Sequence, residues 1–170
     1  MKSDARERDS SDMDLNMEGL GAYILKASTI KPGDVLFVGS VSGRTKHVVD
    51  LAWEAKKMGI KVIAMSSLSY ARSVDPVHSS GQKLIDFVDL TLDNCAPAAE
   101  AMLEVEGIEA NFAAASGIAS SYILWSVTAV VLEEMMKRGK TPRLLKSVNF
   151  PGGVDYNNAE VYPHYKEFGW

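Results

Sequence analysis

The sequence of 170 residues predicts an α/β fold of three layers (αβα) around a mostly parallel sheet. The run at 35–38 is continuous and apolar, as a buried parallel strand is, and residues 60–65 and 86–92 indicate two further strands. Between the first two runs, residues 45–58 repeat apolar side chains at helical spacing. Strands that alternate with helices in this way are typical of a parallel sheet, because each parallel pair needs a long crossover connection.

The first predicted elements are a tail and a helix. Residues 1–13 are polar, charged and without periodicity, which predicts a disordered tail. Residues 15–29 carry apolar side chains at helical spacing and predict a helix, which a turn at 31–34 joins to the strand at 35–38. Three regions are therefore expected: a disordered tail at 1–13, an α/β domain at 14–148 and a C-terminal arm at 149–170.

The helix predicted at 45–58 is amphipathic. Its apolar face carries Val48, Leu51, Ala52, Ala55 and Met58, and its polar face carries Lys46, Asp50, Glu54 and Lys57. Gly59 ends the helix, and the strand at 60–65 follows it. We expect the crossover between the two strands to be right-handed.

The later elements are a short helix, a strand, a hairpin and a long helix. The helix is expected at 82–85 and leads to the strand at 86–92. Residues 102–105 and 108–112 flank Glu106-Gly107 and predict a β-hairpin. The longest helix is expected at 116–138 and is apolar on nearly every side. Such a helix requires burial, either between layers or against another subunit.

Composition and charge exclude several classes of protein. The single cysteine, Cys95, rules out an intramolecular disulfide framework and fits the reducing cytoplasm. The three histidines lack the spacing of metal ligands, so we expect no metal and no other cofactor. The net charge of -4 arises mostly within residues 1–18. The chain therefore lacks a large basic face for nucleic acid.

Membrane insertion and export are not expected either. The N-terminus has no apolar stretch of the kind that a signal peptide needs. Residues 110–132 are uncharged and long enough to span a bilayer. Their hydroxyl and amide side chains, among them Ser116, Ser120, Ser126 and Thr128, make this segment too polar for a membrane span. We expect a cytoplasmic protein.

Small polar side chains follow all three predicted strands. The first strand leads into Gly39-Ser40-Val41-Ser42-Gly43-Arg44-Thr45, the second into Ser66-Ser67, and the third into Asp93-Asn94. Ligands bind at the carboxyl ends of parallel strands, and the first loop opens a helix whose free N–H groups favour an anion. Each loop taken alone also fits a helix cap or a simple turn, and Arg44 fits a solvated side chain as well as a phosphate clamp.

The run FVGSVSGRTKHVVDLAWEAKKMGIKVIAMSS resembles the second half of the sugar isomerase (SIS) domain, whose signature is S-x-S-G-x-T after a strand. The segments at 78–81, 93–94 and 149–157, with Ser116, are similar to a bacterial branch of that family described as phosphosugar-binding. The resemblance implies a phosphosugar site made by Ser40, Ser42, Gly43, Arg44, Thr45, Ser66 and Ser67.

The same resemblance makes His78 and Glu100 candidates for acid and base catalysis. His78 fits a structural hydrogen bond equally well. Glu100 follows Cys95-Ala96-Pro97-Ala98-Ala99, where the branch has a segment resembling G-P-x-G-D, and this departure puts its role in doubt.

Phosphosugar binding is the leading function. The alternatives are an aldose–ketose isomerase similar to phosphoheptose isomerase, a non-catalytic half-domain that assembles with a partner chain, and a flavodoxin-like FMN binder. A whole SIS domain has a preceding half that this chain does not show. The apolar strand at 35–38 therefore needs cover from the N-terminal helix, from residues 110–132 or from a second chain. We expect a homo-oligomer, dimer or higher, or a composite with another chain.

Overall fold

The structure, a computed structural model, describes residues 18–168. The predicted tail at 1–13 lies outside the described residues. The chain divides into two compact units, Met1–Ser120 and Ser121–Trp170. The elements are α1 (Leu20–Ala27), β1 (Val35–Gly39), α2 (Lys46–Lys57), β2 (Lys61–Ser66), α3 (Leu68–Arg72), η2 (Leu84–Asp86), β3 (Leu90–Asp93), β4 (Ala101–Leu103), β5 (Phe112–Ala114), α4 (Ala115–Lys137), α5 (Gly153–Tyr156), η3 (Asn157–Val161) and α6 (Tyr162–Phe168). The predicted domain limits at 14–148 and 149–170 stay predictions.

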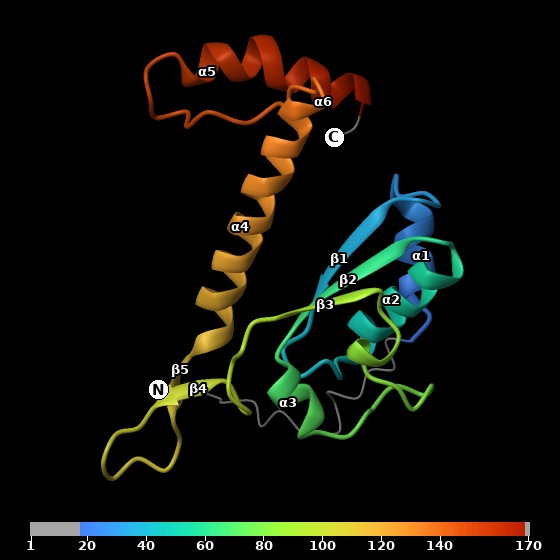
Figure 1. Ribbon diagram of the computed structural model, residues 1–170, viewed down its shortest axis with the longest axis vertical. Helices are drawn as coiled ribbons and strands as arrows, with labels where there is room; N and C mark the ends of the chain where they lie inside the picture. The colour runs from blue at the N-terminus through green and yellow to red at the C-terminus, as the bar shows by residue number, and fades with distance from the viewer. Residues whose placement is uncertain (1–17, 169–170) are drawn as a thin grey trace, which may run out of the picture. The chain divides into compact units, whose positions relative to one another are not determined.

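A parallel sheet in the order β1-β2-β3 is the centre of the first unit (Figure 1). Val35 of β1 pairs with Lys61 of β2, and Ile63 of β2 pairs with Leu90 of β3. The predicted α/β class and parallel sheet are confirmed. The third strand is shorter than the predicted 86–92, because a 3₁₀ turn, η2, occupies Leu84–Asp86.

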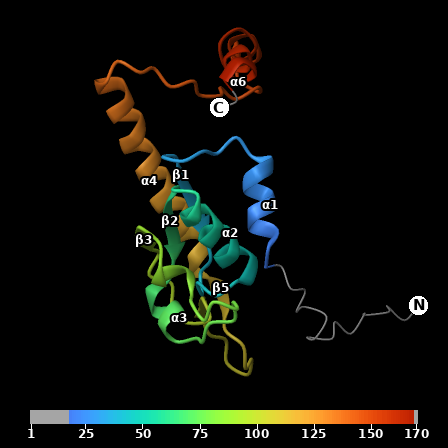
Figure 2. The same ribbon diagram turned by 90° about the vertical axis from the view of Figure 1, so that its right-hand side faces the viewer.

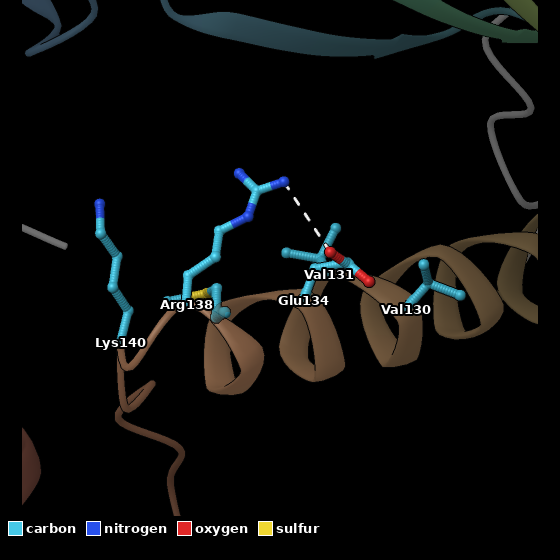
Figure 3. A pocket seen from close by; sticks show the side chains of 6 residues that line it. Val130, Val131, Glu134, Arg138 and Lys140 are labelled. Carbon is cyan, nitrogen blue, oxygen red and sulfur yellow. Dashed lines mark ion pairs between the residues drawn. The ribbon is translucent and has the colours of Figure 1, made fainter.

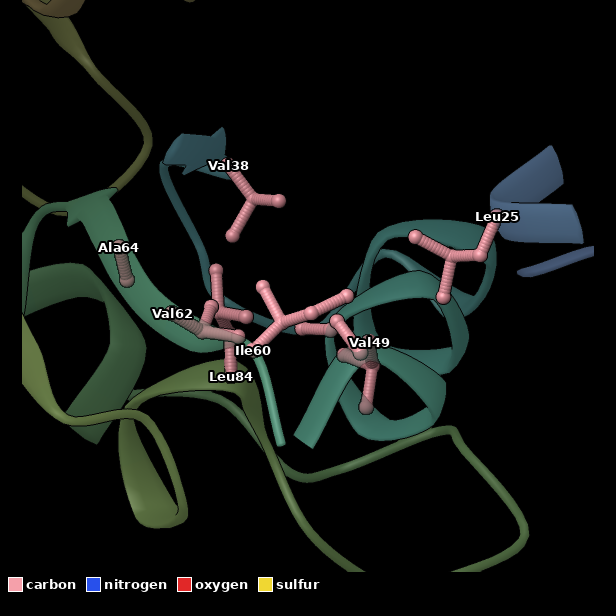
Figure 4. Packing of buried hydrophobic residues seen from close by; sticks show 9 residues of the cluster. Leu25, Val38, Val49, Ile60, Val62, Ala64 and Leu84 are labelled. Carbon is pink, nitrogen blue, oxygen red and sulfur yellow. The ribbon is translucent and has the colours of Figure 1, made fainter. Parts of the chain in front are cut away.

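The hydrophobic core lies between one face of this sheet and α2. Val38, Val62 and Ala64 project from the sheet toward Val49 of α2, with Ile60 and Leu84 between them (Figure 4). Val49, Val62, Ala64 and Leu84 are fully buried. Apolar area removed from water at this density is the main force that holds strand and helix together.

The opposite face of the sheet carries apolar side chains that remain exposed. Val35, Phe37 and Leu90 are 44–51% exposed. The strand order explains this difference between the faces. Right-handed connections that move across the sheet in one direction, from β1 to β2 to β3, place both crossovers on the same face. Within the described first unit, β1 is also an edge strand, as the sequence predicts.

Helix α1 packs against α2, and the two appear together in both views (Figures 1 and 2). The contact is close because Gly21 has no side chain: a Cβ there would lie 2.7 Å from Cα of Leu51. The backbone N–H of Gly21 donates to Oδ2 of Asp50 at 2.7 Å. Asp50 falls on the polar side of the amphipathic pattern, yet it does not face solvent. Its carboxylate is buried and caps the first turn of a neighbouring helix.

The predicted hairpin is present with different limits. Strands β4 and β5 are antiparallel, with Ala101 opposite Ala114 and Leu103 opposite Phe112. Residues 104–111 form the loop, so pairing begins farther from Glu106-Gly107 than the alternating pattern predicts. The residues of this loop are exposed. Ordering them as strands would cost conformational entropy without burying apolar surface in a core.

Helix α4 has nearly the predicted limits but lacks the predicted cover. Ser116 is its buried residue, and most of its large apolar side chains are exposed. Both expected kinds of burial, between layers of the same chain and against another subunit, stay predictions. By length and composition alone, α4 is the one helix among residues 18–168 that would be able to cross a membrane.

The C-terminal part of the second unit is helical. The sequence predicts an ordered arm from 149, and the structure forms α5, a π-helical turn η3 and α6 there. Asn157 anchors this arm to the preceding segment. Its Oδ1 accepts the N–H of Lys146 and its Nδ2 donates to the carbonyl of the same residue, both at 2.8 Å. The side chain is buried and both of its polar atoms are satisfied.

Candidate functional site

The loop Ser40–Thr45 joins β1 to α2 at the carboxyl end of the sheet. The N–H of Ser40 donates to the carbonyl of Met65 at 3.1 Å, which extends the pairing of β1 and β2 into the loop. The N–H of Gly43 donates to the carbonyl of Ser40 at 3.0 Å and closes a tight turn. Across this turn, Oγ of Ser40 and Oγ1 of Thr45 are 3.0 Å apart. The two hydroxyls that the sequence singles out are therefore neighbours.

Gly43 is the position where the loop needs glycine. Its φ of 66° lies in the left-handed region, which side chains other than glycine rarely adopt. A Cβ at this position would lie 3.4 Å from Cβ of Ala71 and 3.5 Å from Oγ of Ser66. The carbonyl of Gly43 also accepts the N–H of Leu84 at 2.8 Å. The loop is thus fixed from α3 on one side and from η2 on the other.

The start of α2 leaves its first N–H groups without a side-chain cap. Thr45 is the N-cap residue, and its side chain makes no capping hydrogen bond because its hydroxyl lies against Ser40 instead. Its carbonyl accepts the N–H groups of Val48 and Val49, each at 3.0 Å, so the helix begins regularly. An anion placed before this helix would meet backbone donors and the positive end of the helix dipole.

Ser66 ends β2, and Ser67 precedes α3. Both are fully buried. The hydroxyl of Ser66 donates to the carbonyl of Val41 at 3.1 Å. The hydroxyl of Ser67 donates to the carbonyl of Ala96 at 2.6 Å and accepts the N–H of Tyr70 at 3.0 Å. These partners use both the donor and an acceptor site of Ser67.

Helix α3 is an element that the sequence reasoning missed. Ser67 caps it, and the helix has only five residues, Leu68–Arg72. A serine followed by a mixed run of this length is a weak signal, because helical periodicity needs more than one turn to be visible. The N-cap serine was the feature that would have revealed it.

The third strand end contributes structural contacts. Oδ1 of Asp93 accepts the N–H of Leu68 at 3.1 Å and that of Cys95 at 2.9 Å. The buried Asn94 accepts the N–H of Ala96 at 3.1 Å and donates to Oγ of Ser120 at 3.2 Å. The sequence places these two residues at the same sheet edge as the first loop, and the structure agrees. Their polar atoms order the segment after β3.

His78 is buried between a loop turn and α2. Its Nδ1 accepts the N–H of Ser80 at 3.2 Å, so the proton of the neutral ring belongs on Nε2. That atom is buried without a hydrogen-bond partner and lies 3.9 Å from Oδ1 of Asp50. Sequence reasoning selected His78 but missed Asp50, whose burial depends on the contact between α1 and α2.

Glu18 lies beside the same turn. Its Oε1 accepts the N–H of Ser79 at 2.9 Å. Hydrogen bonds from the side chain and the backbone of Ser79 lower the pKa of Glu18, and the positive charge of Lys46 acts in the same direction. The carboxylate therefore stays ionised beside a turn that also holds His78 in place.

Glu100 lies at the base of the hairpin, next to the start of α4. Its carboxylate accepts a short hydrogen bond from the hydroxyl of Ser116, and its carbonyl accepts the N–H of Ala115 at 3.0 Å. Its φ of 69° is unusual for a residue with a side chain. The carboxylate is thus committed to a contact between the hairpin and α4.

No group of three or more His, Cys, Asp or Glu side chains within residues 18–168 is arranged to hold a metal ion. A hollow in the second unit is lined by Val130, Val131, Glu134, Met135, Arg138 and Lys140 (Figure 3). Figure 3 shows the guanidinium of Arg138 directed at Glu134, with 3.8 Å between Nη2 and Oε2. None of the site residues predicted from the sequence lines this hollow.

Comparison with known proteins identifies the family. Residues 2–67 match the model of the SIS domain. A UPF0309 protein of Shouchella clausii is 36% identical over 148 residues, which cover 87% of this chain and 60% of that protein. UPF0309 proteins of Oceanobacillus iheyensis and Streptomyces avermitilis are 33% and 37% identical over 151 and 153 residues, covering 89% and 90% of this chain and 61% and 59% of their own lengths. These matches support an SIS domain family in the bacterial branch of the UPF0309 proteins.

The residues that match the SIS domain model can be compared with the predicted site residues. The match includes the loop Ser40–Thr45 together with Ser66 and Ser67, and it ends before His78 and Glu100. SIS domains as a family bind carbohydrate derivatives. This SIS chain spans about 60% of the length of the UPF0309 relatives described above.

Proposed function

We propose that this SIS chain binds a phosphorylated sugar and holds its phosphate at the loop Ser40–Thr45. The observation that carries the proposal is the start of α2, where the side chain of Thr45 leaves the first N–H groups uncapped. The loop before it is fixed by hydrogen bonds to β2 and η2 and lies within the part of the chain that matches the family. A phosphate oxygen placed before this helix would meet backbone donors and the positive end of the helix dipole.

Each loop residue has a distinct task in this proposal. The hydroxyls of Ser40, Ser42 and Thr45 donate to phosphate oxygens, and Gly43 lets the backbone approach them closely. Arg44 supplies the positive charge that a dianionic phosphate requires. The hydroxyl of Ser66 and the N–H of Ser67 support the loop through the carbonyl of Val41, so their contribution is to its shape.

Binding is favoured over turnover by the surroundings of the two candidate catalytic residues. The ring of His78 is buried and its Nε2 faces Asp50. The carboxylate of Glu100 accepts a hydrogen bond from Ser116. An isomerase needs a base that reaches the substrate carbon, and both groups are engaged elsewhere. We also propose a cytoplasmic location and an assembly of more than one chain.

Calorimetric titration with fructose 6-phosphate, a heptose 7-phosphate and glucosamine 6-phosphate tests the proposal. At least one of them should bind, and unphosphorylated fructose should not. Ser42→Asp places a negative charge in the loop and should weaken binding by at least about tenfold, which corresponds to about 1.4 kcal/mol.

The matched control is Ser147→Asp, in the second unit. Ser147 is exposed and accepts the N–H of Asn149, a bond that an aspartate also makes. This variant should bind as the wild type does. A folded wild-type chain that binds none of the three sugar phosphates contradicts the proposal, and so does equal weakening by both substitutions.

A further inference from the structure

Helix α4 presents a continuous apolar stripe to solvent. Residues 115–132 contain no charged side chain. Within α4, apolar residues recur at alternating intervals of four and three, and these positions form the stripe: Ile118, Tyr122, Trp125, Ala129, Leu132 and Met136. The first three side chains are 77%, 75% and 74% exposed. Intervals of four and three keep a stripe on one side of a helix, as in helices that pair along their length.

The polar side chains of α4 do not oppose burial. The hydroxyl of Ser126 donates to the carbonyl of Tyr122 at 2.9 Å, and that of Thr128 donates to the carbonyl of Leu124 at 2.8 Å. Hydroxyls that bond to their own helix carry no unpaired donor into an apolar contact. The helix is therefore able to bury a face without leaving these groups unsatisfied.

We propose that α4 pairs with α4 of a second copy of this chain, antiparallel and along the stripe. The inference is independent of the phosphosugar proposal. In the register centred between residues 122 and 125, Tyr122 of each copy faces Trp125 of the other. Outside this aromatic pair, large side chains face small ones, with Ile118 opposite Ala129 and Leu132 opposite Ala115. The stripe is thus complementary to itself in size, which a closed two-fold contact requires.

Charge favours the antiparallel direction. The charged residues of α4 all lie in its last turns, and they are Glu133, Glu134 and Lys137, with Arg138 directly after the helix. Glu134 already pairs with Lys137 at 2.8 Å and with Arg138 at 3.8 Å in its own helix (Figure 3). An antiparallel pair places these turns outside the uncharged overlap of about 27 Å, at 1.5 Å per residue. A parallel pair would bring like charges and like dipole ends together.

Sedimentation of the full chain tests the pairing. The wild-type chain should sediment as a dimer, and Trp125→Glu should convert it to a monomer with unchanged helical content. Val130→Glu is the matched control. Val130 is 59% exposed and lies about 120° around the helix from the centre of the stripe, at 100° per residue. This variant should remain a dimer.

Cysteine pairs test the register. In a Cys95→Ser background, a mixture of chains carrying Ile118→Cys and chains carrying Ala129→Cys should form a mixed disulfide-linked dimer. Chains with Ile118→Cys alone should not cross-link, because antiparallel pairing separates the two copies of this position by about 16 Å, beyond the 7 Å that a disulfide spans.

Several results would overturn the proposal. They are a wild-type monomer at tens of micromolar, dissociation by Val130→Glu equal to that by Trp125→Glu, and cross-linking of Ile118→Cys with itself. A monomer that floats with phosphatidylcholine vesicles would overturn it too, because the stripe would then meet lipid.

Discussion

Helices α2 and α4 are the two longest helices of the described chain, and they differ in how much of their apolar surface is covered. Helix α2 buries Val49, Ala52 and Ala55 against the sheet and α1. Helix α4 has nearly twice the length, and its buried residue is a serine. The amphipathic helix α2 has one apolar face, and the sheet and α1 of the first unit pack against it. A helix that is apolar on most sides needs more cover than its neighbours in sequence provide.

The largest expected effect compares two isoleucines. Ile60 is 2% exposed in the core beside α2, and Ile118 is 77% exposed on α4. Ile60→Ala should lower the free energy of unfolding by about 2–5 kcal/mol, because it removes buried methyl groups and leaves a cavity. Ile118→Ala should change it by less than about 0.5 kcal/mol in dilute monomer. Urea titration measures both.

A loss of unfolding free energy from Ile118→Ala that grows with protein concentration would sharpen the comparison, since it would show that α4 is buried when chains associate. A loss as large as that of Ile60→Ala at every concentration would break it, because α4 would then be buried within one chain.

The second comparison uses two glycines. Gly21 lies in the contact between α1 and α2, where a Cβ would meet Cα of Leu51 at 2.7 Å, whereas the Cβ position of Gly117 in α4 is open. Gly21→Ala should destabilise the chain by about 1–3 kcal/mol, because the helices must separate. Gly117→Ala should stabilise it by about 0.5–1 kcal/mol, because alanine restricts the unfolded chain. Thermal unfolding should show a lower melting temperature for Gly21→Ala and a higher one for Gly117→Ala. A shift of both melting temperatures in the same direction would contradict the packing described.

The smallest expected effect compares two ion pairs. Asp89 accepts from Lys56 of α2 at 2.6 Å and from the N–H of Val62 at 2.7 Å. The hydrogen bond from Lys56, followed by that from Val62, lowers the pKa of Asp89 below its ordinary value of 3.8. The folded state therefore favours the carboxylate. Its contribution to stability is complete above about pH 4 and is lost as the pH falls through the lowered pKa.

Asp89→Asn should thus reduce stability near neutral pH and should match the wild type in strong acid. Glu134→Gln on α4 is the control, because its exposed pairs with Lys137 and Arg138 lie within one helix and contribute little. Acid titration followed by circular dichroism compares the three proteins. A difference between Asp89→Asn and wild type that widens as the pH falls would contradict the assigned sign.

Much of the first unit is predictable because its signals are local. Short apolar runs locate β1 and β2, a period of 3.6 residues locates α2, and glycine and proline mark the turns between them. The loop Ser40–Thr45 is predictable for the same reason, since its two neighbouring hydroxyls are five residues apart. The position of Asp50 is not, because it depends on a contact with Gly21, 29 residues away. The short helix α3 was missed because one turn has no visible period.

The fold class, the order of strands and helices and the loop that opens α2 follow from the sequence by itself, since each rests on side chains close together in the chain. The sequence also specifies how apolar α4 is. Only the tertiary structure decided that Asp50 caps α1, that Ser66 and Ser67 face inward, and that Val35, Phe37 and Leu90 remain exposed on one face of the sheet. A side chain is buried when another element packs against it, whereas a sequence pattern describes the surface of one element and not its partner.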